Sequence, residues 1–255
     1  MSPHSYLEHG ITILQTRLQD PGILSRTPFQ PAVQPFLSVS RQTCAGGTTV
    51  SQEVLRLLNG LEGAERSSWA LLNKDLLFRA LQEHHLPERL AGFLPEDRVS
   101  EIQGVIGELV GLHPPLWELE RHVAEAMLQL AKVGRVILAG RAAHLVTREL
   151  PGGFHVRLIA SPPVRLQRMM ARLHCDEATA RTCLAQSDQA RRRFVRARFD
   201  REIDDPADYD LVLNTDRLDP GIAARIIVTG LLENVNARRA VSAVAAANPS
   251  VSRAG

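Results

Sequence analysis

The stretch "FLSVSRQTCAGGTTVSQEV", Phe36–Val54, decides the fold. Its first five residues form an apolar run typical of a buried strand, the glycines indicate a turn, and the apolar residues that follow recur at helical spacing. A helix that begins directly behind a glycine turn presents unpaired backbone N–H groups and the positive end of its dipole. This order of elements predicts an anion site of the kind that holds phosphate.

The segment from Arg41 to Thr48 matches the phosphate-loop pattern G-x-x-x-x-G-K-[ST] at two of its four named positions. Gly46 takes the second glycine, and Thr48 takes the hydroxyl position, which normally holds Mg²⁺. Arg41 stands at the first glycine and Gly47 at the lysine. Two interpretations are open at this point: a phosphate loop without its lysine, or a tight turn that needs two glycines for backbone reasons only.

Composition describes an ordinary globular chain of 255 residues, 44% of them hydrophobic. A net charge of +2 indicates neither a nucleic acid nor a membrane surface as partner. Nearly all the cations are arginine, because the only lysines are Lys74 and Lys132. Any phosphate chemistry must therefore rest mainly on arginine side chains and backbone amides.

The three cysteines, Cys44, Cys175 and Cys183, lack a metal-ligand spacing, so we expect neither a zinc site nor a disulfide framework. Cys44, at the predicted helix start, is either a reactive thiol or, more simply, a small residue that fills the loop. No apolar run approaches the ~20 residues of a membrane span. The first residues also lack the basic and apolar regions of a secretory signal. We therefore expect a cytoplasmic protein without a membrane partner.

Strands and helices alternate along the chain. Buried strands are predicted at "FLSVS", "RVILAGR", "FHVRLIAS" and "YDLVLNT", and an amphipathic helix at "PPLWELERHVAEAMLQLAKVG". Short buried strands between helices are typical of a parallel sheet covered on both faces. Residues 1–35 form an N-terminal extension, expected to be partly disordered. Residues 236–255, which are small and polar, are expected to form a disordered tail.

Arginines gather at two places where phosphate could bind. Arg141 directly follows a predicted buried strand, where doubly wound sheets bind ligands, although a surface arginine at a strand end is the alternative. Five more follow Asp188 on one predicted helix: Arg191, Arg192, Arg193, Arg196 and Arg198. Solvated ion pairs with Asp188 explain part of this cluster, but its mutual repulsion favours an anionic partner. Nucleic acid is the less favoured partner, because aromatic residues make up only 4% of the chain.

Several segments together resemble the cytidylate kinase-like family, the offshoot of the nucleoside monophosphate kinases whose phosphate loop reads S-R-Q-x-x-x-G-G. They are the opening stretch, "NKDLL", "VILAGRAAHLV", "FHVRLIASPPVRLQRM", "SDQARRRFVRARF" and "DYDLVLNTDRLDPGIAARII". The resemblance runs from about Phe36 to Glu233. It implies an α/β fold of three layers, the P-loop NTPase type, with a parallel sheet flanked by helices. The domain would span 36–235, with a helical acceptor-binding insertion at about 67–116 and a lid at about 186–205.

The resemblance also implies ATP and Mg²⁺ as cofactors and nucleotides as small-molecule partners. Donor phosphates would be surrounded by Ser40, Gln42, Ala45, Gly46, Gly47, Thr48 and Thr49, with the hydroxyl of Thr48 on the magnesium ion. Candidate catalytic residues are Arg41, Arg141, Asp188, Arg191 and Arg192, and Arg41 would supply part of the missing positive charge. Candidate acceptor-binding residues are Asp75, Arg141 and Arg196. Asp204 and Asp205 are assigned to a loop, and a role in holding Mg²⁺ is the other option.

Two positions depart from true cytidylate kinases. Those enzymes have a G-R-D motif, and Ala142 stands at the position of its aspartate in this chain. Their lid has the pattern D-x-x-D-R, which is D-x-x-R-R here, at Asp188, Arg191 and Arg192. Our first hypothesis is ATP-dependent phosphoryl transfer to a nucleoside monophosphate, CMP or dCMP by family. The alternative, motivated by Gly47, is a nucleotide-binding protein with little or no transfer activity and a regulatory role. The sequence predicts no oligomeric state.

Overall fold

This computed structural model describes residues 34–61, 69–73, 116–140 and 142–247. The strands in these ranges form one sheet of five, in the order β2-β3-β1-β4-β5, and every neighbouring pair is parallel. They are β1 (Phe36–Arg41), β2 (Ala70–Asn73), β3 (Val136–Ala139), β4 (Gly153–Ile159) and β5 (Leu211–Asn214). The predicted parallel α/β sheet is therefore confirmed.

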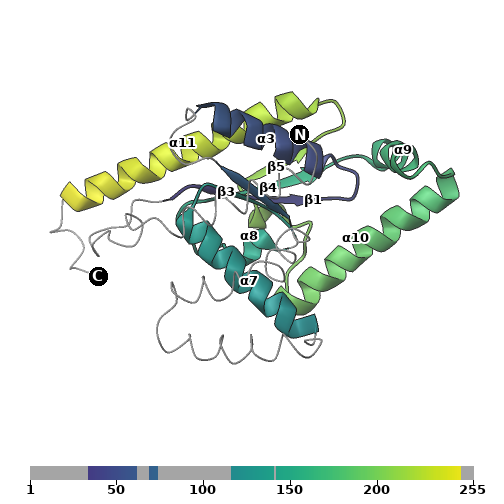
Figure 1. Cartoon of the computed structure of the whole chain (residues 1–255), viewed down its shortest axis with the longest axis horizontal. Coiled ribbons are helices and arrows are strands. Elements are labelled where there is room, and N and C mark those ends of the chain that lie inside the picture. Colours follow the sequence, from purple (N-terminus) through teal and green to yellow (C-terminus); the bar gives the residue numbers. More distant parts are fainter. Residues whose placement is uncertain (1–33, 62–68, 74–115, 141, 248–255) are drawn as a thin grey trace.

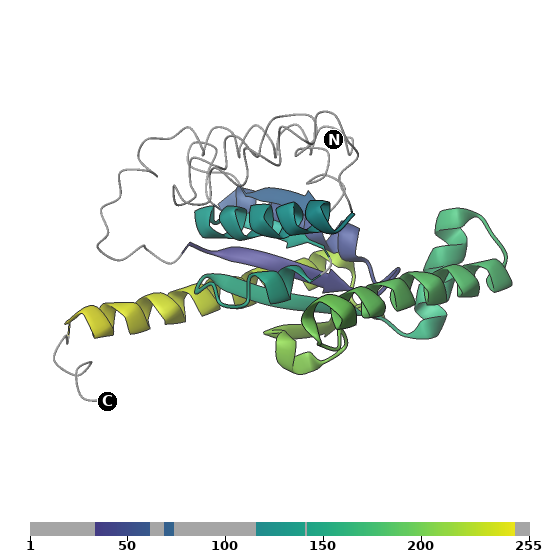
Figure 2. The ribbon, with the colours of Figure 1, turned by 90° about the horizontal axis from the view of Figure 1, so that it is seen from below.

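Helices cover both faces of the sheet. They are α3 (Gly47–Leu61), α7 (Leu116–Val133), α8 (Ala143–Val146), α9 (Pro162–Leu173), α10 (Glu177–Phe199) and α11 (Pro220–Ala247), with a short 3₁₀ helix, η1, at Pro206–Asp208. Figure 1 shows α3 and α11 on one face and α7 and α8 on the other, which gives the three layers that we expected. Helices α9 and α10 project from the sheet as a pair (Figures 1 and 2). Among the helices of the described ranges, none combines the length and apolarity needed to cross a membrane.

Side chains of the central strands point alternately to the two faces of the sheet, so the hydrophobic core of the sheet has a cluster on each face. Leu37 and Val39 of β1 and Val156 and Leu158 of β4 belong to the cluster under α3 and α11. Phe36 belongs instead to the cluster under α7, which includes three residues of the predicted amphipathic helix: Val123, Met127 and Leu130. Successive strand residues point to opposite faces, so a parallel sheet needs apolar cover on both sides.

The strand order places a crevice between β1 and β4. The chain leaves β1 through α3 toward β2 and β3, and leaves β4 through α9 and α10 toward β5, on the other side. The carboxyl ends of β1 and β4 therefore meet at the switch point, where open α/β sheets bind ligands. Gln42 joins the two ends: its N–H donates to the Leu158 carbonyl (3.0 Å), and its Oε1 accepts from the Ala160 N–H (3.1 Å).

Two expectations differ from the structure. The predicted tail is helical as far as Ala247, because α11 continues through an alanine-rich segment that no glycine or proline interrupts after Gly230. Residues 70–73, which were expected within a helical insertion, form β2 and pair with β3. Four residues are too few to show the strand period in the sequence. The rest of the insertion, 74–115, and most of the N-terminal extension, 1–33, lie outside the described residues.

Candidate functional site

The loop between β1 and α3 has the turn that the glycines predicted. The Ala45 N–H donates to the Gln42 carbonyl (3.2 Å), and the Val50 N–H donates to the Gly46 carbonyl (2.9 Å) as the helix begins. Gly46 has a φ of 80°, a left-handed conformation that glycine adopts without steric cost. Cys44 has a φ of 61°, which is uncommon for a residue with a side chain. The first amides of α3 have no partners within the helix, as an anion site requires.

Side chains from outside the loop hold two of its carbonyl groups. Arg168 of α9 donates to the Cys44 carbonyl (3.2 Å) and to the Thr215 hydroxyl (3.1 Å). The buried Thr215 hydroxyl lies 3.1 Å from the Ala45 carbonyl, to which it donates. These contacts fix the orientation of two peptide units in the loop. The loop geometry therefore depends on residues far along the chain as well as on its own glycines.

A carboxylate from α10 binds directly to this loop. Oδ1 of Asp188 accepts hydrogen bonds from the backbone N–H (2.9 Å) and the hydroxyl (2.6 Å) of Thr43. The same carboxylate pairs with Arg165 of α9 and lies 3.4 Å from Nη1 of Arg191. Burial raises the pKa of Asp188, but the hydrogen bonds from Thr43 and Arg165 outweigh burial and hold the pKa below its ordinary value. Asp188 is therefore a stable anion at the loop.

A second carboxylate, Asp204, pairs with two further arginines. Arg157 is buried in β4 directly opposite Ser40 of β1, and its Nη1 donates to the Ser40 hydroxyl (2.8 Å). Its Nη2 donates to Asp204, which also accepts from Nε of Arg192 on α10 (3.0 Å). Burial raises the pKa of Asp204, but the positive charge and hydrogen bond of Arg157, with those of Arg192, bring the pKa below its ordinary value.

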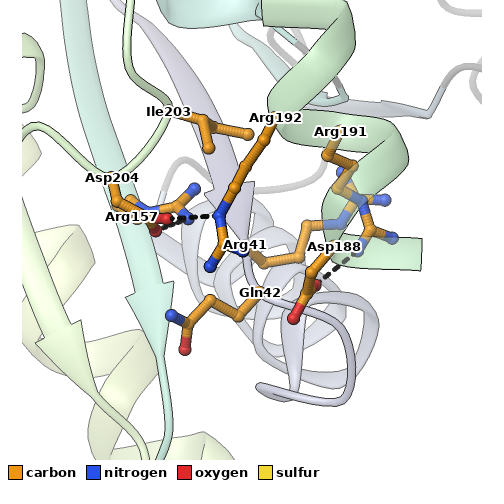
Figure 3. A pocket seen from close by; sticks show the side chains of 8 residues that line it. All are labelled: Arg41, Gln42, Arg157, Asp188, Arg191, Arg192, Ile203 and Asp204. Atoms are coloured by element: carbon orange, nitrogen blue, oxygen red, sulfur yellow. Dashed lines mark hydrogen bonds and ion pairs between the residues drawn. The ribbon is translucent and has the colours of Figure 1, made fainter. Parts of the chain in front are cut away.

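The two carboxylate clusters lie on either side of one cleft (Figure 3). In this view Arg192 extends from α10 to Asp204, and Arg41 extends from the end of β1 toward Arg191 and Asp188. The described residues that line the cleft include four arginines and two aspartates. Its walls are Arg41, Gln42, Arg157, Asp188, Arg191, Arg192, Ile203 and Asp204. Even with both carboxyl groups ionised, the four arginines outnumber the two aspartates. The cleft therefore has a net positive charge, which suits an anion.

Several of the predicted site residues meet here. Arg41, Gln42, Asp188, Arg191 and Arg192 line the cleft, and Ser40 contacts it through Arg157. In the loop, Ala45 is buried and Gly46 is half-buried. In the first turn of α3, Gly47 is buried, and Thr48 and Thr49 are exposed.

One predicted residue stands apart from this group, and two more fall outside the described part of the chain. Arg196 pairs with Asp200 (3.5 Å) and Glu202 (3.2 Å) farther along α10 and does not line the cleft. Arg141 and Asp75 lie outside the described residues.

Three residues of the site were not expected from the sequence: Arg157, Arg165 and Thr43. Arg157 had a visible signal, because an arginine in the middle of the apolar run "FHVRLIAS" is costly to bury without a partner and a purpose. Arg165 and Thr43 had none, since each gains its role through Asp188, which is distant in the sequence.

Magnesium would find few protein ligands here. In the part of the chain that the structure describes, no group of three or more histidine, cysteine or acidic side chains could hold a metal ion. Asp204 is engaged by arginines, and Asp205 accepts from the Ala207 N–H at the start of η1. The exposed hydroxyl of Thr48 suits the way Mg²⁺ binds beside nucleotide phosphates, with one or two protein ligands and several waters.

Comparison with solved structures supports the fold. An uncharacterized protein from Eubacterium ventriosum has a TM-score of 0.54 and 17% sequence identity, with coverage of 78% of this chain and 98% of that one. Shikimate kinases from Bacteroides thetaiotaomicron and Acinetobacter baumannii each have a TM-score of 0.43, at 15% and 14% identity. The matches to these two cover 80% of this chain and 99% and 96% of their own lengths. A search of curated protein sequences found no match.

A family model gives the relationship directly. The model described as the cytidylate kinase-like family matches residues 36–217. That range contains every described strand, the loop before α3, and both Asp188 and Asp204 with their arginines. With most of the chain matched, including the candidate site, the protein belongs to the cytidylate kinase-like family.

Proposed function

We propose that this protein transfers the γ-phosphoryl group of ATP, with Mg²⁺, to a nucleoside monophosphate, with CMP and dCMP as the first candidates. The observation that carries the proposal is the arginine-rich cleft at the β1–β4 switch point, next to the N-terminus of α3. Membership of a kinase-like family supports nucleotide-dependent phosphoryl transfer. The choice of acceptor rests on the resemblance to cytidylate kinases alone.

The chemistry needs positioning and positive charge more than it needs a base. An oxygen of the acceptor phosphate forms a bond to the γ-phosphorus while the bond to the bridging oxygen of ADP breaks. The attacking phosphate is already anionic, so no side chain has to remove a proton. Amides of the loop would bind the donor phosphates, and Arg191 and Arg192 would neutralise the charge that develops on the transferred group. Bound Mg²⁺, held by Thr48 and phosphate oxygens, would supply further charge neutralisation.

The test is ADP release from ATP and Mg²⁺ across a panel of ribo- and deoxyribonucleoside monophosphates. We expect turnover with a pyrimidine acceptor, reduced about 100-fold by Arg192→Ala, since one lost transition-state contact typically costs 10²–10³ in rate. Arg181→Ala is the matched control, because Arg181 lies on the same helix but is exposed and, among the described residues, pairs with Glu177 (2.6 Å) rather than with a cleft residue. This variant should retain wild-type turnover.

Three outcomes would contradict the proposal in whole or in part. If no nucleoside monophosphate in the panel supports ADP release, although ATP is shown separately to bind, the protein would instead be a nucleotide-binding protein with a regulatory role. Equal losses in the Arg192 and Arg181 variants would assign the effect to the stability of α10 rather than to the cleft. Acceptance of a purine nucleotide alone would retain the reaction but overturn CMP and dCMP as acceptors.

A further inference from the structure

The two positions at which the loop departs from the phosphate-loop pattern touch each other in the structure. A Cβ atom placed on Gly47 would lie 2.7 Å from Cγ, 3.0 Å from Cδ and 3.2 Å from Cβ of Arg41. The aliphatic part of the Arg41 side chain therefore passes over Gly47, through the space that any side chain at position 47 would need. Because the closest atoms are near the Arg41 backbone, that side chain cannot simply move aside.

Backbone conformation does not explain why position 47 is glycine. Gly46 has a positive φ of 80°, which accounts for the second glycine of the loop. Gly47 does not have a positive φ, and it is the first residue of the regular helix α3. A residue with a side chain could adopt this backbone conformation, and alanine would favour the helix more than glycine does. The contact with Arg41 is therefore the feature that requires glycine at this position.

We propose that Arg41 is the loop's cationic ligand for the β- and γ-phosphates of a nucleoside triphosphate, brought from the end of β1 in place of a lysine from α3. In this assignment the two departures from the phosphate-loop pattern depend on each other: Arg41 replaces the first glycine and supplies the charge, and Gly47 replaces the lysine and leaves room for the Arg41 side chain. Arg41 lines the cleft beside Gln42, so its charge lies at the loop. A guanidinium group also suits the task, since its planar fork donates to two phosphate oxygens at once.

The assignment rests on the proposed use of ATP, and the chain offers a direct test. Replacing Arg41 by Gly and Gly47 by Lys turns residues 41–48 into G-Q-T-C-A-G-K-T, which satisfies the full phosphate-loop pattern. ATP affinity in the presence of Mg²⁺ is measured for the wild type, R41G, G47K and the double variant. R41G should lose about tenfold or more in affinity, the effect of removing one charge-assisted hydrogen bond. G47K should also lose affinity through steric conflict, and the double variant should recover most of both losses.

Thermal unfolding tests the steric part without any ligand. Gly47→Ala should lower the unfolding midpoint in the wild-type background, where the new methyl group meets Arg41, and raise it in the R41G background. Gly60→Ala is the matched control in the same helix, because a Cβ there has nothing within 4 Å. It should raise the midpoint in both backgrounds, as is usual for alanine in place of glycine in a helix. Arg41→Met, which keeps the aliphatic contact and removes the charge, should lose ATP affinity with little change in midpoint.

The outcomes separate this assignment from the proposed function. If the wild type binds and turns over ATP while R41G and Arg41→Met bind it equally well, the kinase function stands and the role of Arg41 is wrong. If the losses in R41G and G47K simply add in the double variant, the two positions are not exchanged for one another. If the wild type binds no ATP, the proposed function fails and the role of Arg41 fails with it.

Discussion

The carboxylate of Asp188 accepts hydrogen bonds from both the backbone N–H and the hydroxyl of Thr43, at 2.9 and 2.6 Å. A side chain on α10 therefore occupies an amide of the loop at which phosphate is expected to bind, and the same carboxylate pairs with Arg165 and Arg191. In this arrangement Asp188 serves as an internal anion. A phosphate that enters the cleft would compete with Asp188 for the same positively charged groups.

Asp188→Asn should expose that competition. The substitution removes the negative charge but keeps an oxygen beside Thr43, and it leaves Arg165 and Arg191 without this anionic partner. We expect the free energy of unfolding to fall by about 1–3 kcal/mol. Sulfate should raise the unfolding temperature of the variant more than that of the wild type, since it can bind between the two arginines. Thermal unfolding with and without sulfate measures both effects.

The matched control for this prediction is Asp200→Asn. Asp200 lies at the end of the same helix, is largely exposed, and its Oδ1 lies 3.5 Å from Nε of Arg196. It should show no sulfate-dependent difference from the wild type. The internal-anion interpretation would be wrong if sulfate stabilised the Asp188 variant no more than the wild type.

Thr215→Val tests whether the loop is held from outside. The substitution keeps the side-chain shape but removes the hydroxyl that binds the Ala45 carbonyl and accepts from Arg168. We expect a loss of about 1–2 kcal/mol in the free energy of unfolding by urea, because buried polar groups are left unpaired. The control, Thr182→Val, removes an exposed hydroxyl of α10 that donates to the Ala178 carbonyl one turn earlier in the same helix. Equal effects of the two substitutions would contradict the proposed support of the loop.

His144 should make the folded state sensitive to mild acid. Its ring stacks on Tyr209 with centroids 4.4 Å apart, and neither ring nitrogen has a hydrogen-bond partner in the described structure. Burial, together with the smaller effects of the charges on His155, Arg157 and Arg148, lowers the pKa of His144 to about 3. The folded state therefore resists a proton that the unfolded chain accepts near pH 6.5. Stability is present above that value and is lost as the pH falls below it.

His144→Phe should remove this pH-dependent part of the stability and keep the ring stacking on Tyr209. Between pH 7 and pH 5 the wild type should lose about 2 kcal/mol more free energy of unfolding than the variant, from the unfolded-state protonation of one histidine. Urea unfolding at the two pH values gives the difference. His155, whose pKa burial also lowers, contributes equally to both proteins and cancels. Parallel loss in the two proteins would mean that His144 takes up a proton in the folded state.

Cys44 should be an unreactive thiol. Burial raises its pKa, which outweighs the lowering effect of Arg172, Arg165 and Arg168, and its sulfur lies 3.9 Å from that of Met169. In a Cys175→Ser/Cys183→Ser background, alkylation by iodoacetamide at pH 8 should be slower than in the same protein unfolded in urea. The rate should continue to rise above pH 9, because thiolate is the reacting form. Fast labelling near neutral pH would support the reactive-thiol interpretation instead.

The loop shows how far the sequence predicted this site and where it could not. Both glycines were visible, and the chain pattern placed them between a strand and a helix. The reasons for them differ, however: Gly46 is required by its backbone conformation and Gly47 by contact with Arg41. Sequence alone does not separate these causes, since the second depends on the direction of one side chain.

The two carboxylates show the same limit over longer distances. Arg157 stands out in the sequence because it interrupts an apolar run. Its partner Asp204 lies in a loop whose sequence does not indicate the pairing. Asp188 was selected with its helical neighbours, yet its strongest contacts are with Thr43 and Arg165. Strand and helix periodicity is local, so it predicted four of the five described strands and the helices that became α3, α7 and α10. Pairings across the switch point arise only when β1, β4 and α10 come together.

The cleft has one consequence for how the protein responds to its surroundings. Its described walls contain guanidinium groups, which stay protonated, and two carboxyl groups whose pKa values lie below the ordinary range. The net charge of these walls therefore does not change with pH near neutrality. The charge of a phosphate monoester does change, since its second proton is lost near pH 6. An activity profile recorded between pH 5 and pH 8 would therefore report the ionisation of the ligand, with these walls serving as a fixed reference.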